Sequence, residues 1–105
     1  MSRLSPCPSE LTAFEQGIKK SREGDYLGAI QAFDQALLLD PNDAEVYGNR
    51  CVARHRSGDT QGAIADCQKA ADLYLKQGNL ARHEYALKSL ARLKSSLGER
   101  VIGDR

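Results

Sequence analysis

Apolar residues recur every three or four positions along most of the chain, and short polar clusters interrupt them, which predicts a succession of amphipathic helices. Leu11, Phe14 and Ile18 lie on one face of the first predicted helix. Ser9 is its expected N-cap, and the helix is expected to run to about Arg22. Residues 1–8 contain two prolines and no periodicity, so we expect a disordered lead-in.

The second predicted helix begins after Asp25, which is its expected N-cap. We expect it to end near Asp40, because Pro41 disfavours the helical conformation of the residue before it and has no N–H to donate. Its apolar stripe consists of Tyr26, Ile30, Phe33 and Leu37, with the small residues Ala29 and Ala36.

Three further helices follow from the same signals. Asn42 or Asp43 is expected to cap the third helix, which Gly58 ends, and the fourth is expected to start at Asp59 and Thr60. The fourth is expected to continue to Gly78, since no proline follows it. Asn79 is the expected cap of the fifth helix, whose wide apolar stripe consists of Tyr85, Ala86, Leu87, Leu90, Leu93 and Leu97.

The chain repeats itself with a period of 34 residues, which is typical of stacked two-helix units. Such a unit does not bury its apolar face alone and must pack against a neighbour. Eight residues are identical at this shift: Arg22, Gly24, Asp25, Gly28, Ala29, Ile30, Ala36 and Leu39 match Arg56, Gly58, Asp59, Gly62, Ala63, Ile64, Ala70 and Leu73.

These residues resemble the tetratricopeptide repeat (TPR). The resemblance rests on Gly24, Asp25, Tyr26, Ala29, Ile30, Phe33, Ala36 and Pro41. It implies an all-α fold, an α-solenoid of two helix-turn-helix units and a C-terminal capping helix, five helices in all. Repeat one then spans 10–43, repeat two 44–77 and the capping helix 79–98, within a domain over 9–98, and 99–105 form a flexible tail. Small residues are expected where paired helices touch most closely: Gly17, Ala29 and Ala36 in unit one, and Cys51, Ala63 and Ala70 in unit two.

The second unit carries a characteristic set of residues: Asn49, Arg50, Ala53, Arg54, Gly58, Asp59, Gly62, Ala63, Ile64, Ala65 and Asp66. With them it is similar to a repeat subtype common in cyanobacterial and other bacterial proteins. Arg50 and Arg54 depart from the apolar residues that the family prefers at their positions. They lie four residues apart, so they share a helix face, and Asp66 on the partner helix is their expected ion-pair partner. Contact with a ligand is the alternative role.

The resemblance implies a protein-interaction adaptor or scaffold that binds a peptide segment of a partner in a concave groove, apolar at one end and polar at the other. Asn49 is expected to hold the peptide backbone and Arg82 to reach an acidic group. Phe14 and Ile18 occupy positions where one class of the family carries a Lys and an Asn that clamp a chaperone's C-terminal carboxylate, which argues against that ligand. The expected groove residues are Leu11, Phe14, Ile18, Ser21, Glu45, Asn49, Val52, His55 and Arg82.

Composition is ordinary for one soluble domain, and a formal net charge of +1 gives no overall attraction to nucleic acid or anionic lipid. The C-terminal segment is nevertheless basic, so a nucleic-acid interface through Lys88 and Arg92 is an alternative. A homo-oligomerising assembly module is a further alternative, because Leu11, Phe14 and Ile18 have no polar cap over them. No apolar run is long enough to cross a membrane, and we expect a cytoplasmic protein.

Three cysteines, Cys7, Cys51 and Cys67, are an odd number and predict reduced thiols in a cytoplasmic protein rather than a disulfide framework. Cys51, His55 and Cys67 together would form a three-ligand metal site, but we interpret both cysteines as packing residues, because no fourth ligand is spaced nearby. The sequence shows no catalytic constellation, so we expect no enzyme activity, no cofactor and no metal.

Overall fold

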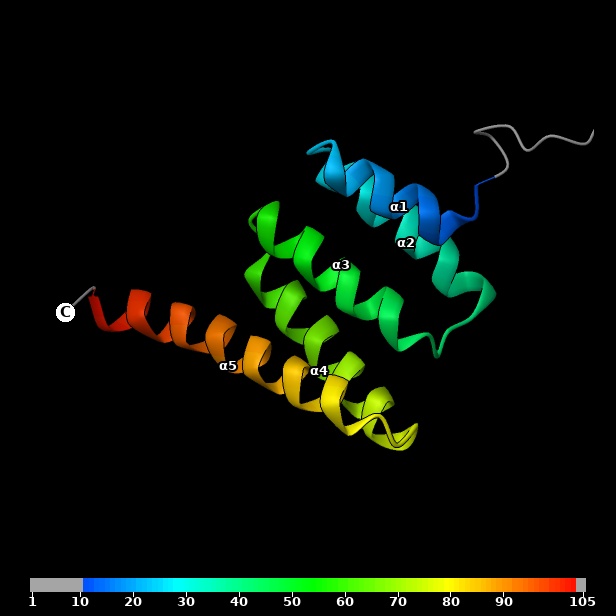
Figure 1. Cartoon of the computed structure of the whole chain (residues 1–105). Coiled ribbons are helices and arrows are strands. Elements are labelled where there is room, and N and C mark those ends of the chain that lie inside the picture. Colours follow the sequence, from blue (N-terminus) through cyan, green and yellow to red (C-terminus); the bar gives the residue numbers. More distant parts are fainter. Residues whose placement is uncertain (1–10, 104–105) are drawn as a thin grey trace, which may run out of the picture.

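The computed structural model describes residues 11–103, with side chains up to residue 97, and the regular structure in this range is entirely helical. The predicted lead-in over 1–8 and residues 104–105 lie outside the described residues. The five helices follow one another as neighbouring rods from α1 to α5 (Figure 1). The expected fold class, an all-α TPR-like solenoid, is confirmed. The helices are α1 (Ala13–Arg22), α2 (Tyr26–Leu39), α3 (Ala44–Arg56), α4 (Thr60–Lys76) and α5 (Leu80–Gly103).

Each helix packs on the next one in the chain, and α1 also touches α3. The pair α1–α2, which we call unit one, therefore stacks on the pair α3–α4, unit two, through α2 and α3. The last helix, α5, covers α4. The pairwise stacking is what the 34-residue period predicts.

Helix starts follow the expected capping residues with one correction. The side chain of Asp25 accepts a hydrogen bond from the Gly28 N–H, and Asp59 accepts one from the Gly62 N–H, both at 2.9 Å. The first helix begins later than predicted: Thr12 and Glu15, rather than Ser9, form a reciprocal capping box. Leu11 therefore precedes α1 instead of lying on it.

The other caps agree with the sequence. Asp43 is the N-cap of α3, and its carboxylate accepts from the Glu45 and Val46 N–H groups. The side chain of Asn79 accepts from the Arg82 N–H at 3.2 Å at the start of α5. That helix continues to Gly103, past the predicted end at residue 98.

The core of unit one is built on an aromatic ring set against a glycine. Phe33 is fully buried, and a Cβ atom added at Gly17 would overlap its ring. The ring of Phe14 lies 6.0 Å from that of Phe33, centroid to centroid. Ala29 and Ile30 complete the contact between α1 and α2. Glycine is thus required at residue 17 by close approach.

The matching positions of unit two hold two thiols. Cys51 and Cys67 stand 34 residues after Gly17 and Phe33, and each is only 4% exposed. Their Sγ atoms lie 2.9 Å apart. Both cysteines pack with Ala63 of α4 and with Leu90 and Leu93 of α5, which agrees with the packing role expected from the sequence.

A buried carboxylate at Asp66 holds an ion-pair cluster within unit two, and Arg50 extends this cluster to unit one. Arg50 donates from Nε and Nη2 to the two oxygens of Asp66, at 2.9 and 2.8 Å, and from Nη1 to Asp34 Oδ1 at 2.7 Å. Arg54 Nε lies 3.1 Å from Asp66 Oδ2. The predicted ion pairing is therefore confirmed. The hydrogen bonds to Asp66 raise the pKa of Arg50, so its charge is permanent.

The capping helix α5 presents a narrower apolar face to α4 than its sequence predicts. Ala86, Leu90 and Leu93 are buried, and His83 Nδ1 donates to the carbonyl oxygen of Ala71 at 2.8 Å. Tyr85, expected in the buried stripe, is 70% exposed, and Leu87 is also exposed. Residues one position away from the buried set fall on a different side of a helix, because each residue turns it by 100°.

Candidate functional site

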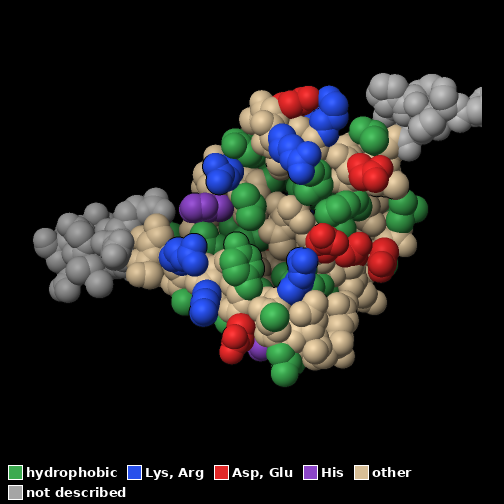
Figure 2. All heavy atoms as spheres, in the orientation of Figure 1, with side chains coloured by type: hydrophobic (Ala, Val, Ile, Leu, Met, Phe, Trp, Pro, Cys, Tyr) green, Lys and Arg blue, Asp and Glu red, His purple; other side chains and the backbone are tan. Residues whose placement is uncertain are grey.

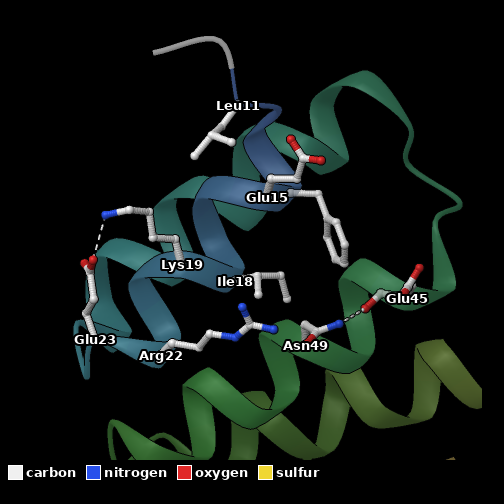
Figure 3. A pocket seen from close by; sticks show the side chains of 9 residues that line it. Leu11, Glu15, Ile18, Lys19, Arg22, Glu23, Glu45 and Asn49 are labelled. Carbon is white, nitrogen blue, oxygen red and sulfur yellow. Dashed lines mark hydrogen bonds and ion pairs between the residues drawn. The ribbon is translucent and has the colours of Figure 1, made fainter. Parts of the chain in front are cut away.

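Three hollows lie along the surface formed by α1, α3 and α5. The first, the α1–α3 hollow, has a volume of about 830 Å³ (Figure 3). The second, the α3–α5 hollow, has a volume of about 490 Å³. The third, which we call the His55 hollow, holds about 520 Å³ further along the same two helices. Glu45 and Asn49 line both of the first two, and Cys51, Val52, Tyr85 and Ser89 line both of the last two, so the hollows form one continuous groove.

The α1–α3 hollow is more charged than the sequence predicts. Phe14 and Ile18 line it, but both are half-buried and pack against the core of unit one. Lys19 and Glu23 form an ion pair of 2.6 Å at its edge (Figure 3). The charges follow from the helix period, since residues 15, 19 and 22 of α1 share the side that carries residue 18. The expected apolar end of the groove is thus of mixed character.

Asn49 lies where the α1–α3 and α3–α5 hollows meet. Its side-chain Nδ2 donates to the carbonyl oxygen of Glu45, one turn earlier in α3, at 2.9 Å (Figure 3). This bond fixes the orientation of the amide and uses one of the two N–H donors of Nδ2. Asn49 therefore offers a partner the acceptor Oδ1 and the second N–H.

The α3–α5 hollow is the more apolar part of the groove. Val52 on α3 and Tyr85 on α5 are both largely exposed on its walls, at 49% and 70%. Ala81, Ala86 and the two buried cysteines extend the apolar lining. The capping helix supplies much of this surface, so the apolar section of the groove lies at unit two.

The charge along the groove differs between the start of α3 and the His55 hollow. Asp40, Asp43 and Glu45 line a separate small hollow together with Arg82 beside the start of α3. His55, Arg56 and Arg92 line the His55 hollow, which is the basic end of the groove. Figure 2 shows acidic side chains on one side of this face and histidine with basic side chains on the other. A bound peptide with a basic residue near the start of α3 and an acidic residue near the His55 hollow would therefore bind in that orientation rather than in the reverse one.

Eight expected groove residues line one or more of these hollows: Leu11, Phe14, Ile18, Glu45, Asn49, Val52, His55 and Arg82. Arg82 also lies over Tyr74, with its Cζ atom 6.0 Å from the ring centroid. Ser21 is partly buried and lines none of the three. Tyr85, Ser89 and Arg92 were missed as groove residues, although their spacing of three and four along α5 is the signal of a shared helix side.

No group of three His, Cys, Asp or Glu side chains in the part of the chain that the structure describes is placed to hold a metal ion. Within residues 11–103, no helix has both the length and the apolar character that a membrane crossing requires. His55 is exposed while Cys51 and Cys67 are buried, so the three do not converge.

Comparison with known proteins gives several relatives, although no family model matches the chain. Human tetratricopeptide repeat protein 36 is 38% identical over 80 residues, 75% of this chain and 42% of that protein. Human small glutamine-rich tetratricopeptide repeat-containing protein beta is 39% identical over 54 residues, 51% of this chain and 18% of that protein. Protein FlbA of Caulobacter vibrioides is 33% identical over 76 residues, 72% of this chain and 13% of that protein.

The chain thus spans about two fifths of the length of the tetratricopeptide repeat protein 36 sequences that it matches. The names of the two human relatives agree with the period, the turn residues and the stacked helix pairs described above. Together they support a protein of the tetratricopeptide repeat type.

Proposed function

We propose that this chain is a TPR adaptor that holds a peptide segment of a partner protein in the groove along α1, α3 and α5. The observation that carries the proposal is that the three hollows are continuous. Shared lining residues join the α1–α3 hollow, which has charged and apolar walls, to the apolar α3–α5 hollow and then to the basic His55 hollow. A preformed groove loses little entropy when it binds. The similarity to tetratricopeptide repeat proteins supports an interaction role rather than catalysis.

The chemistry of the groove specifies the segment. Apolar partner side chains would be buried against Val52 and Tyr85, and Asn49 Oδ1 would accept a hydrogen bond from a partner backbone N–H. An acidic partner residue would face His55 and Arg92. Burial over so short a groove corresponds to affinity in the micromolar range, about −8 kcal/mol.

A random peptide library displayed on phage tests this proposal with the whole chain as bait. We expect selected peptides to combine apolar residues with an acidic residue and to bind in the micromolar range by calorimetry. Asn49→Ala should weaken that binding by about tenfold, the equivalent of one hydrogen bond. Val52→Asp should weaken it further, because it places a charge in the apolar section.

Leu38→Ser is the matched control, since Leu38 is exposed on α2 and lines none of the three hollows. Circular dichroism should show equal helicity for all variants. The proposal is wrong if no peptide is enriched, or if the selected peptides bind the Asn49 and Val52 variants as tightly as they bind the parent.

Self-association is the second candidate, and exposed leucines favour it. Leu38 and Leu39 at the end of α2 are 75% and 84% exposed, and Leu80 at the start of α5 is also exposed. Sedimentation equilibrium measures it directly. Nucleic-acid binding by Lys88 and Arg92, the bacterial repeat subtype and a cytoplasmic location stay predictions.

A further inference from the structure

Cys51 and Cys67 meet across the two helices of unit two. Their Sγ atoms are 2.9 Å apart, and a disulfide bond of about 2.05 Å would require them to approach by about 0.9 Å more. Each thiol stands on a regular helix, and the 16-residue separation in sequence brings both to the same level of the α3–α4 pair. Small side-chain rotations are therefore enough to join them.

The α3–α5 hollow reaches both cysteines. Cys51 and Cys67 line this hollow, although each residue is only 4% exposed. A small uncharged oxidant reaches such thiols more readily than a bulky disulfide reagent does. The burial of the two thiols therefore favours small oxidants over large ones.

The two thiols also differ in acidity, which decides which sulfur reacts first. The hydrogen bond from Cys51 lowers the pKa of Cys67 and outweighs its burial, which acts in the opposite direction. The same bond, together with burial, raises the pKa of Cys51. Cys67 is therefore the sulfur that ionises first and attacks first.

We propose that Cys51 and Cys67 form a disulfide when a small hydroperoxide such as hydrogen peroxide enters the α3–α5 hollow. This modification does not depend on the proposed adaptor function.

The steps balance with hydrogen peroxide as the two-electron oxidant. The Cys67 thiolate attacks one peroxide oxygen, the O–O bond breaks, and the released hydroxide takes a proton to become water. The sulfur of Cys51 then attacks the sulfenic sulfur of Cys67, the S–O bond breaks, and the Cys51 proton leaves with the oxygen as a second water. Two thiols are oxidised to one disulfide, and one peroxide is reduced to two waters.

The test uses the full chain carrying Cys7→Ser, so that Cys51 and Cys67 are its two thiols. After mild treatment with hydrogen peroxide, we expect both thiols to be lost in a titration under denaturing conditions. The mass should fall by that of two hydrogen atoms, and a proteolytic peptide should contain both cysteines. The Tm should rise by about 10 °C and return to its starting value with a reductant, because the cross-link restricts the unfolded chain.

Unit one supplies the matched control. Cys51→Gly combined with Cys67→Phe installs the pair found at Gly17 and Phe33, and the same treatment should leave its Tm unchanged. In the Cys51→Ala variant, a sulfenic-acid reagent should label Cys67. The proposal is overturned if both thiols survive the treatment, if Cys67 proceeds to a sulfinic acid without a cross-link, or if the disulfides join two chains.

Discussion

The two units solve the same packing problem with different chemistry. In unit one the closest helix contact sets Phe33 against Gly17, a large ring against a residue with no side chain. In unit two the equivalent residues, Cys67 and Cys51, are of equal size and meet sulfur to sulfur. The comparison teaches that the repeat accepts different residue types at this contact, with a smaller combined side-chain volume in unit two than in unit one.

A second pair of equivalent positions also carries different residue types in the two units. Gln16 and Ala32 in unit one correspond to Arg50 and Asp66 in unit two. Gln16 donates only to the nearby carbonyl oxygen of Leu11, at 3.1 Å, whereas Arg50 binds Asp66 through two hydrogen bonds. Unit one is thus held by apolar volume, and unit two depends on a satisfied buried ion pair.

The largest difference should follow from removing the side chain at equivalent positions. Phe33→Ala should lower the free energy of unfolding by about 4 kcal/mol, because it leaves a ring-sized cavity. Cys67→Ala removes a single buried sulfur and should cost about 1 kcal/mol. Urea denaturation followed by circular dichroism measures both. If both variants lost the same free energy of unfolding, the two units would not differ in how much this contact stabilises them.

A smaller loss should follow from Asp66→Asn, which removes the charge that Arg50 and Arg54 share. We expect about 3 kcal/mol, because the partly buried guanidinium of Arg50 loses its carboxylate. Asp72→Asn in the same helix is the control and should cost less than about 0.5 kcal/mol, since Asp72 is exposed. If urea denaturation finds the two substitutions equivalent, unit two does not depend on its ion pair.

The smallest effect should come from one methyl group at Gly17. Gly17→Ala should destabilise the protein by about 2 kcal/mol, because the new Cβ overlaps the ring of Phe33. Gly48→Ala on α3 has open space around it and should stabilise by up to about 1 kcal/mol through helix propensity. Thermal unfolding of the two variants measures both changes, and a Gly17→Ala variant as stable as Gly48→Ala would contradict the close contact in unit one.

The fold was predictable because its signals are local. Asp25, Asp43 and Asp59 each cap the helix that the sequence assigns to them, and α2 ends just before Pro41. The predicted start at Ser9 was wrong, since Thr12 and Glu15 form a better cap by bonding reciprocally. A capping box is itself a sequence signal, so this start was open to prediction.

The groove was harder to predict, because part of it depends on how α5 rotates about its own axis. The positions taken from the first helix of each unit, such as Asn49 and Val52, line the hollows because the repeat fixes their direction. Tyr85 is apolar and lies next to buried Ala86 in sequence, so periodicity alone assigned it to the core. Only the packing of α5 on α4 shows that Ala86 is buried and Tyr85 is exposed.

Arg50 has a geometric consequence for the whole array. It belongs to unit two, yet it holds Asp34 of unit one and Asp66 of its own unit at the same time. The guanidinium group of Arg50 is planar and is hydrogen-bonded on both edges, so it restricts rotation of unit one relative to unit two. A side chain outside the groove thus helps to hold the angle between the two hairpins, and with it the spacing of the two helices, α1 and α3, that line the first section of the groove.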